Sequence, residues 1–312
     1  MIGSGSRGLV AESATNEKYV LPLVVRVARR RPGLSEMLLN PADGASAVPG
    51  MSSVKETPAK YGFLGTGAIA QAIVTGLCEG SKDAPTILLS PRSAARAADL
   101  AGRYSSVEVA SDNQALADRA SIVVICVRPQ DASEIVTGLQ FAADQAIVSV
   151  MAGVPINRLA ELVAPATNIA RAIPLPSVAR RAGVTPITPQ TDAARGLFDD
   201  LGGSLVVTDT SSFDALTAAT ATIAAHFRYL GTISLWLSTH GIDQRDASRY
   251  VSSMFADVGA TLDDVSADLS ELAADHATPG GINERFSAML EHGGTFELVS
   301  KSLENILHTL RT

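Results

Sequence analysis

The 312-residue chain has few cysteines, few aromatic residues and no excess of positive charge. Its two cysteines, Cys78 and Cys126, stand in apolar segments, so we expect buried free thiols rather than a disulfide or a metal pair. This cysteine usage favours a reducing, cytoplasmic setting. Aromatic residues make up 4% of the chain and the formal net charge is −7, which argues against a nucleic-acid binder.

Long apolar runs are also missing. No uninterrupted apolar stretch approaches the ~20 residues that span a bilayer, so we expect no membrane segment. Hydrophobic residues nevertheless make up 46% of the chain and the mean hydropathy is +0.20, which suits a well-buried globular protein. The length is sufficient for about two domains.

The first 58 residues differ from the rest and are predicted to be a flexible extension. They begin with glycine and serine, carry a basic cluster at 26–31 and include a loop-like stretch at 40–50. The apolar stretch before the basic cluster is short and the flank order is wrong for a secretory signal. Met51 offers an alternative translation start, which predicts a natural product without residues 1–50; mass spectrometry of the native protein tests this hypothesis.

Residues 61–80 are typical of a strand, a tight turn and a helix. The small residues follow the spacing Gly65-x-Gly67-x-x-Ala70, which is the dinucleotide fingerprint with alanine at its third place. A glycine turn before a helix also occurs without a ligand, so the fingerprint is weighed together with later motifs. The predicted cofactor contacts in this turn are Gly65, Gly67, Ala68, Ile69 and Ala70.

From residue 60 onward, short apolar segments alternate with helical patterns. Strands are expected at 61–64, 86–90, 107–110, 121–127, 146–151, 168–172, 185–188 and 204–207. Helices are expected between them at 68–79, 93–104, 113–119, 132–139, 156–163 and 191–200. The alternation predicts an α/β fold with a Rossmann-type, doubly wound parallel sheet, forming a dinucleotide-binding domain over residues 59–210.

After Asp209 the strands stop, and residues 211–312 are expected to form an all-helical dimerisation and substrate domain. A helix capped by Ser211 or Ser212 should run to about Thr239, roughly 40 Å long and apolar on most sides. Such a helix is usually buried, and ~100 residues cannot easily surround it, so we expect a homodimer or higher homo-oligomer. Further helices are expected at 243–261, 264–276, 283–292 and 296–310.

The residues after the second expected strand indicate which dinucleotide binds. NAD sites usually have an acidic residue there, whereas this chain has Ser90, Arg92 and Ser93, with Arg96 one turn later. Two hydroxyls and an arginine suit a 2′-phosphate, which favours NADPH over NADH. The alternative for Arg92 is a solvated loop arginine.

The order of the motifs from about residue 60 to residue 310 resembles the pyrroline-5-carboxylate reductase family. The matching pieces are Gly65–Ala70, Asn113, Val127–Pro129, Val148–Val154, Arg171–Pro174 and Thr278–Gly281. The resemblance implies a helical domain interleaved with a partner chain, and hydride transfer from NADPH to a cyclic imine, such as pyrroline-5-carboxylate reduced to proline. It implies further cofactor contacts at Asn113, Val127, Arg128, Pro129, Ala152 and Gly153, and substrate contacts at Pro174, Gly280, Gly281 and Ile282.

The residues themselves agree with this resemblance in the cofactor half. The segments 127–129 and 151–154 follow carboxyl ends of expected strands, where ligands bind in open α/β sheets. Ala152 and Gly153 would let a nicotinamide ring lie against bare backbone. Asn113 matches a family position near the adenine-side ribose, and a helix cap is its alternative role.

The substrate half departs from the family pattern in three segments, at 173–177, 219–226 and 282–284. Polar residues of the family are replaced in the first, and a proline and a tyrosine are lost in the second. Removing one hydrogen-bond partner of a charged group costs about 1.5–3 kcal/mol, so several changes together retune specificity. The remaining candidate catalytic residues are Thr220, Thr222, His226 and Asn283; His226 could equally be a core or interface histidine, and Asn283 a first-turn residue.

Two other functions stay open. A β-hydroxyacid-dehydrogenase-like oxidoreductase shares this architecture but uses a lysine on the helix between the domains. The lysines here are Lys18, Lys55, Lys60, Lys82 and Lys301, none of them on that helix. A non-catalytic NADP-binding homologue would explain the departures from the family pattern in the three segments of the substrate half. No residue pattern indicates a metal site.

Overall fold

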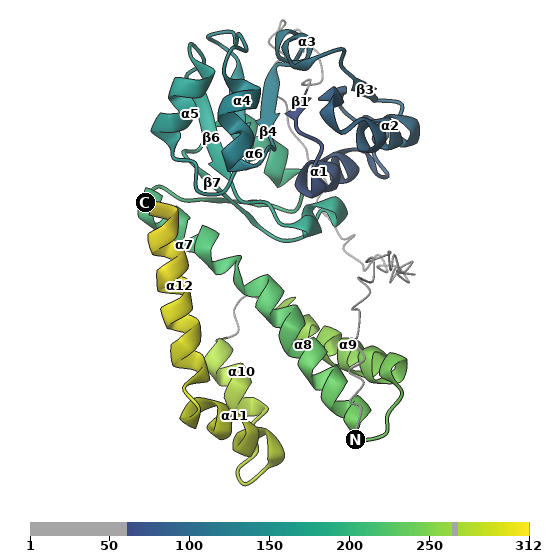
Figure 1. The fold of residues 1–312 in the computed structure, drawn as a ribbon, viewed down its shortest axis with the longest axis vertical. Coiled ribbons are helices and arrows are strands. Elements are labelled where there is room, and N and C mark those ends of the chain that lie inside the picture. Colours follow the sequence, from purple (N-terminus) through teal and green to yellow (C-terminus); the bar gives the residue numbers. More distant parts are fainter. Residues whose placement is uncertain (1–60, 264–267, 312) are drawn as a thin grey trace, which may run out of the picture. The chain divides into compact units, whose positions relative to one another are not determined.

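The computed structural model describes residues 61–263 and 268–311, which hold an eight-stranded sheet followed by helices (Figure 1). The predicted extension over 1–58, with Met51, lies outside the described residues, as does the start of the helix expected at 264–276. The strand order is β3-β2-β1-β4-β5-β6-β7-β8. The chain enters at β1, runs outward to β3, and returns to β4 beside β1, so the strand order reverses between β1 and β4.

The eight strands confirm the doubly wound sheet, but the sheet is not wholly parallel. They are β1 Tyr61–Leu64, β2 Ile87–Leu89, β3 Val107–Val109, β4 Ile122–Ile125, β5 Ala146–Ser149, β6 Asn168–Ala172, β7 Thr185–Thr188 and β8 Ser204–Val206. All neighbours are parallel except β6 and β7, which pair antiparallel. Only a 3-10 turn, η3 (Pro176–Arg180), interrupts the β6–β7 connection, and without a crossover helix the chain returns in the opposite direction.

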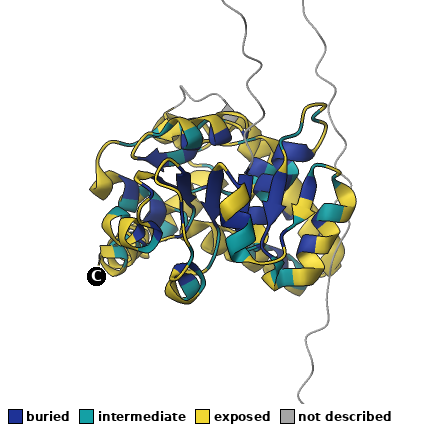
Figure 2. Cartoon of the chain, turned by 90° about the horizontal axis from the view of Figure 1, so that it is seen from above, coloured by how far each residue is buried: buried dark blue, intermediate teal, exposed yellow. Residues whose placement is uncertain are grey.

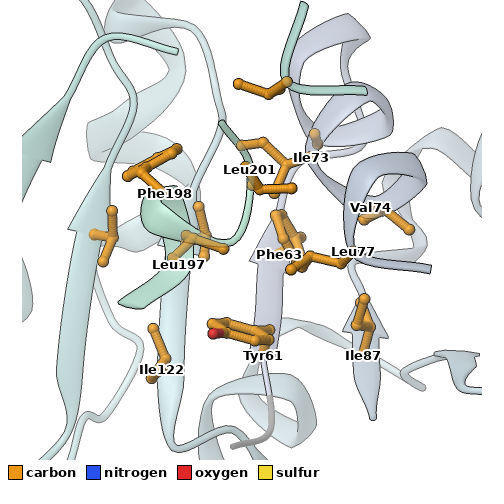
Figure 3. Close-up of a cluster of buried hydrophobic side chains, with 14 of the residues drawn as sticks. Tyr61, Phe63, Ile73, Val74, Leu77, Ile87, Ile122, Leu197, Phe198 and Leu201 are labelled. Atoms are coloured by element: carbon orange, nitrogen blue, oxygen red, sulfur yellow. The ribbon is translucent and has the colours of Figure 1, made fainter. Parts of the chain in front are cut away.

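Helices cover both faces of the sheet because alternate strand residues point to opposite sides. The helices of this part are α1 Ala68–Cys78, α2 Ala94–Arg103, α3 Asn113–Arg119, α4 Ala132–Val136, α5 Ile156–Val163 and α6 Asp192–Asp199, with 3-10 turns η1 Pro91–Ser93 and η2 Pro129–Asp131. Phe63 packs with residues of α1, α2 and α6, whereas its neighbour Leu64 packs with residues of α3, α4 and α5. Figure 3 shows Phe63 near Leu77 of α1 and Leu197 of α6.

The single long helix predicted after Asp209 is wrong, because the structure breaks it into two. The helices of this part are α7 Thr210–Ala219, α8 Thr222–Thr239, α9 Gln244–Ala260, α10 Leu269–Asp275, α11 Ile282–His292 and α12 Thr295–Arg311, with the 3-10 turn η4 Thr261–Asp263. At the break, the N–H of Thr220 donates to the carbonyl of Thr217, three residues back, and the Thr220 hydroxyl donates to the same carbonyl. This competition for carbonyl groups tightens the turn and interrupts the α-helical pattern.

The cap of α7 is also different from the prediction. Asp209, rather than Ser211 or Ser212, is the N-cap, and its carboxylate accepts a 2.8 Å hydrogen bond from the N–H of Ser212. The two serine hydroxyls donate to the same carboxylate oxygen. Ser211 and Ser212, which were predicted to be caps, therefore stabilise the side chain of Asp209, which caps the helix.

Apolar side chains on α8 remain exposed in the single chain. Figure 2 colours the chain by burial, with the strands of the sheet mostly dark blue and much of the helical surface yellow. Phe227 is 66% exposed, Leu235 63% and Trp236 58%, and Ser234 is the buried residue of this helix. The described residues thus do not cover α8 by themselves, and the predicted homodimer stays a prediction. None of the described helices is long and apolar enough to cross a membrane.

The cap of α7 leads to a prediction about acid stability. Hydrogen bonds from the hydroxyl of Ser211 and from Ser212 lower the pKa of Asp209 from 3.8 to about 2. Because this folded-state pKa is depressed, the ionised carboxylate stabilises the fold above about pH 4, and the contribution is lost as the pH falls from about 4 to about 2. Asp209→Asn should be less stable than wild type at pH 7 and lose less stability over that interval, as measured by urea unfolding at several pH values. Other carboxylates titrate in both proteins, so parallel losses in the two would contradict this role.

Candidate functional site

A cavity of about 290 Å³ lies at the carboxyl ends of β1, β2 and β4, where the strand order reverses. Such a switch point is where ligands bind in open α/β sheets. The cavity is lined by Gly65, Thr66, Gly67, Ser90, Arg92, Ser93, Arg96, Cys126, Val127, Arg128, Asp131 and Ile135. The structure therefore brings together the glycine turn, the residues after β2 and the residues after β4 that the sequence singled out separately.

The glycine turn is shaped by the close approach of β1 and β4. Gly65 has φ +95°, and a Cβ there would lie 2.9 Å from the carbonyl oxygen of Cys126. Gly67 is the N-cap of α1 in an extended conformation, and no side chain caps the helix. The first N–H groups of α1, which have no intrahelical partner, thus face the turn as an anion site. Ala70 is fully buried, while Ala68 and Ile69 are more exposed.

Arginines give the cavity a positive balance. Arg128 pairs with Asp131 at 2.9 Å, whereas Arg92 and Arg96 are exposed and have no carboxylate partner among the residues the structure describes. The residues directly after β2 are Ser90 and Pro91, with no acidic group. Two unpaired guanidinium groups can hold a phosphate ester, and an acidic residue suited to ribose hydroxyls is missing at this place.

Ser90, which lines the cavity, holds the side chain of Asn113, which is not itself a lining residue. The buried hydroxyl of Ser90 donates a 2.8 Å hydrogen bond to Oδ1 of Asn113, the first residue of α3. The helix is capped instead by Asp112, whose carboxylate accepts from the N–H of Ala115 at 2.8 Å. Asn113 is therefore not the helix cap, and its side chain is fixed beside the end of β2. This hydrogen bond orients both the hydroxyl of Ser90 and the side-chain amide of Asn113.

The thiol in the cavity wall is not a reactive group. Burial raises the pKa of the Cys126 thiol, so it stays protonated at neutral pH. Cys78 and Cys126 are both free, as expected from the sequence. Cys78 is buried, whereas Cys126 as a whole residue is partly exposed. Within residues 61–263 and 268–311, no group of three histidine, cysteine or acidic residues could hold a metal ion.

The loop after β5 meets the last helix of the chain. Gly153 has φ +73°, and a Cβ there would lie 3.3 Å from Cδ2 of Leu310 in α12. The sequence predicts that a nicotinamide ring lies against the backbone of Gly153. In the structure, the side chain of Leu310 approaches that glycine. Ala152 is exposed, and Pro129, which begins η2 after β4, is exposed at the same edge of the sheet.

The four candidate catalytic residues do not line the cofactor cavity: Thr220 lies at the break between α7 and α8, Thr222 and His226 on α8, and Asn283 on α11. The hydroxyls of Thr220 and Thr222 each donate at 2.8 Å to carbonyl groups three residues back. His226 lines another cavity, about 450 Å³, with its ring 6.2 Å from that of Phe255. Asn283 lines a third, largely apolar cavity of about 880 Å³ that includes Trp236.

The hydrogen-bonding groups before α11 are used within the chain. The N–H of Gly280 donates to Oε2 of Glu284 at 2.7 Å, and Nδ2 of Asn283 donates to the carbonyl of His276 at 2.9 Å. Gly281 is the N-cap of α11 without a side-chain cap, and Ile282 is exposed. Pro174, the remaining predicted substrate contact, is buried just after β6. The structure does not place these residues in one cavity with the glycine turn.

Sequence reasoning missed a buried ion pair that joins β6 to α7. Arg171 is 3% exposed, and its Nη2 lies 3.0 Å from Oδ1 of Asp214. Its guanidinium also lies 4.6 Å from the ring centroid of Phe213. The signal was an arginine among the buried residues of a strand, because a buried charge requires a partner elsewhere in the fold. Its partner could not be read from the sequence.

Comparisons with known proteins show similarity to oxidoreductases. Residues 60–153 match the family described as NADP oxidoreductase, coenzyme F420-dependent. A pyrroline-5-carboxylate reductase of Mycobacterium leprae is 28% identical over 282 residues, covering 79% of this chain and 94% of the relative. One of Mycobacterium tuberculosis is 32% identical over 184 residues, covering 54% and 61%.

Solved structures show the same fold. A 1-pyrroline-5-carboxylate reductase of Streptococcus pyogenes aligns with a TM-score of 0.70 at 22% identity, over 82% of this chain and 99% of that one. The pyrroline carboxylate reductase of Plasmodium falciparum, solved with NADP bound, gives a TM-score of 0.69 at 16% identity, over 81% and 97%. A Rossmann-type sheet followed by a helical region is thus common to all three chains.

The two glycines of the turn should respond differently to alanine. Gly65→Ala places a Cβ against Cys126 at a positive φ, so it should lower the free energy of unfolding by about 1–3 kcal/mol. At Gly67 the nearest atom to such a Cβ is 4.0 Å away, so Gly67→Ala should fold like wild type yet weaken dinucleotide binding about tenfold by crowding the anion site. Thermal unfolding and calorimetric titration measure the two effects. Unchanged dinucleotide affinity in Gly67→Ala would refute this placement of the ligand.

Proposed function

This chain is related to the pyrroline-5-carboxylate reductases over most of its length, and we propose that it is an NADPH-dependent reductase of a cyclic imine. The observation that carries the cofactor part is the cavity lined both by the uncapped start of α1 and by two arginines without a carboxylate partner among the described residues. The relationship to the reductases supports the reaction part. The candidate substrates are pyrroline-5-carboxylate, which would be reduced to proline, and related imines.

The residues of the cavity fit the parts of NADPH. The N–H groups at Gly67–Ile69 suit the pyrophosphate, because they are unpaired donors at the positive end of a helix. Arg92 and Arg96 suit the 2′-phosphate, and their lack of carboxylate partners leaves both guanidinium groups available to it. Asn113, held by Ser90, suits the adenine-side ribose.

The reaction requires little acid–base apparatus from the protein. NADPH supplies a hydride when it is bound. Protonation of the imine nitrogen makes the carbon electrophilic, so the chain must supply that one proton and position the carbon near the nicotinamide. Addition of one hydride to carbon and one proton to nitrogen reduces the C=N double bond to a C–N single bond, giving the secondary amine, and no covalent intermediate with the protein is needed.

His226 is the proposed proton donor because it is the candidate titratable side chain on α8 and lines a cavity. In the single chain it is separate from the glycine turn, so this role requires that a second copy bring the helical region of one chain to the cofactor cavity of another. The exposed apolar residues of α8 and α9 suit such a partner; they are Phe227, Leu235, Trp236, Tyr250 and Val258. A monomer by light scattering, or unchanged turnover in His226→Ala, would remove this part of the proposal.

Glu284 bears on which imine is preferred. In the resembling family the segment at Gly280–Gly281 holds the substrate carboxylate. Here the carboxylate of Glu284 already accepts from the Gly280 N–H at 2.7 Å, and it would repel a second carboxylate. The segment thus works against an α-carboxylate, and the apolar cavity beside Asn283 suits a less polar imine.

The second candidate function is NADP binding without catalysis. It is favoured by the internal hydrogen bonds of Thr220, Thr222 and Asn283, which occupy groups a substrate would use. A hydroxyacid dehydrogenase is not favoured, because α7 and α8 carry no lysine.

The proposal predicts that the purified protein oxidises NADPH with at least one cyclic imine. The panel contains pyrroline-5-carboxylate, pyrroline-2-carboxylate and 1-pyrroline, together with hydroxy acids in the oxidative direction, and nicotinamide absorbance is followed. We expect turnover on an imine, none on the hydroxy acids, and a preference for NADPH over NADH. NADPH binding without turnover on the whole panel selects the non-catalytic alternative. Arg92→Ala is the control for the cofactor and should reduce the preference for NADPH about tenfold, since it removes a charged hydrogen-bond donor.

Glu284→Gln should improve the use of carboxylate-bearing imines. Removing the negative charge while keeping the shape of the side chain should lower the KM for pyrroline-5-carboxylate about three- to tenfold, because a like charge near the carboxylate is removed. The neutral imine 1-pyrroline is the matched control, and its KM should not change. Equal changes for both substrates would show that Glu284 acts on folding rather than on substrate charge.

A further inference from the structure

We propose that Leu310, in the last turn of α12, forms one wall of the nicotinamide end of the cofactor site, and that the buried pair Arg171–Asp214 positions it there. The inference rests on the proposed NADPH site. It concerns a part of the chain, the end of the helical region, that the glycine fingerprint does not reach.

Leu310 approaches the loop after β5 at a position that only glycine leaves open. A Cβ on Gly153 would lie 3.3 Å from Cδ2 of Leu310, so the leucine would have to shift by a few tenths of an ångström to admit a side chain there. The side chain of Leu310 is partly buried at this contact, on a helix with no buried residue. Leu310 therefore lies beside the bare face of Gly153, and a nicotinamide ring placed at this loop would contact the leucine.

The loop after β5 belongs to the edge of the sheet that carries the cofactor cavity. Ile125, Ser149 and Arg171 are register partners in β4, β5 and β6, so the strands reach this edge at the same level. The residues after Ile125 line the cavity, and the residues after Ser149 lead to Gly153. A dinucleotide that begins at the turn of Gly65 runs along this edge, because ligands follow the carboxyl ends of parallel strands.

A continuous set of contacts fixes α12 relative to that edge. Arg171 on β6 holds α7 through its ion pair with Asp214, 3.0 Å, and through the ring of Phe213. Helix α12 packs along α7, and Nη2 of Arg311 donates to the carbonyl of Ser211 at 3.1 Å. The last turn of α12 is thereby held where Leu310 meets Gly153.

A buried pair is suited to this positioning role. Arg171 and Asp214 are both largely shielded from water, and Nε of Arg171 is buried without a hydrogen-bond partner among the described residues. Such an arrangement is weak support for stability, because desolvation offsets much of the attraction. It defines one orientation of α7, since any other orientation leaves the guanidinium uncompensated.

Two probes separate the two ends of the site. NADPH reaches the nicotinamide end, whereas adenosine 2′,5′-bisphosphate occupies only the adenine end. Leu310→Ala should raise the Kd of NADPH about tenfold, as expected for loss of apolar contacts, and leave the Kd of the bisphosphate unchanged. Ile306→Ala is the matched control: it is the same truncation on an exposed face of α12, and neither Kd should change.

The outcomes distinguish this inference from the proposed function. If wild type binds neither probe, the proposed NADPH site itself is wrong. If both bind and Leu310→Ala leaves the affinity for NADPH unchanged, or weakens both probes equally, the role of Leu310 is overturned.

A double-mutant cycle tests the positioning pair. Asp214→Asn should weaken NADPH relative to the bisphosphate in the wild-type background and add little once Leu310→Ala is present, because both act through the same contact. Fully additive effects would overturn the positioning role. If Asp214→Asn does not fold by circular dichroism, Arg311→Gln serves in its place, since it removes the exposed hydrogen bond to Ser211 that holds the same turn.

Discussion

The close approach of β1 and β4 at Gly65 is the constraint on which the candidate site depends. The carbonyl of Cys126 stands where a side chain at Gly65 would be, so the chain must turn there with a positive φ. That turn aims the uncapped start of α1 at the switch point of the sheet, where the residues after β2 and β4 also converge. The positive charge of Arg92 and Arg96 then acts on the same small volume. The steric condition at Gly65 places the anion site, and the pairing of β2 with β1 brings the two arginines to the same cavity.

The sheet region and the helical region differ in whether the hydrogen-bond donors of their candidate sites are already paired within the chain. In the sheet half, the helix start at Gly67 and the two arginines keep their donors available. In the helical half, the hydroxyls of Thr220 and Thr222 and the N–H of Gly280 are satisfied by the chain itself. A site whose donors are free is ready for a ligand, whereas a site with satisfied donors must first exchange those bonds. The specificity for a dinucleotide is therefore better defined than the specificity for its co-substrate.

Local sequence patterns were sufficient to predict the bounds of helices and strands that depend only on their own residues. Helices α3 and α5 and strands β6 and β7 begin and end at the predicted residues, because apolar periodicity and turn residues are local properties. The glycine spacing likewise placed the turn before α1. The prediction of the N-cap of α7 was wrong, because an aspartate and two serines within four residues are all suitable caps. Only the hydrogen bonds among them select Asp209.

The sequence by itself determined the order of strands and helices, the glycine turn and the arginines after β2, because these depend on residue type and spacing along the chain. Only the tertiary structure decided that β7 runs against β6, that Asp214 is the partner of Arg171, and that Leu310 rests on Gly153. Arg171 and Asp214 lie 43 residues apart, and Gly153 and Leu310 lie still farther apart. Which distant residues meet depends on the packing of whole elements, and no local pattern encodes it.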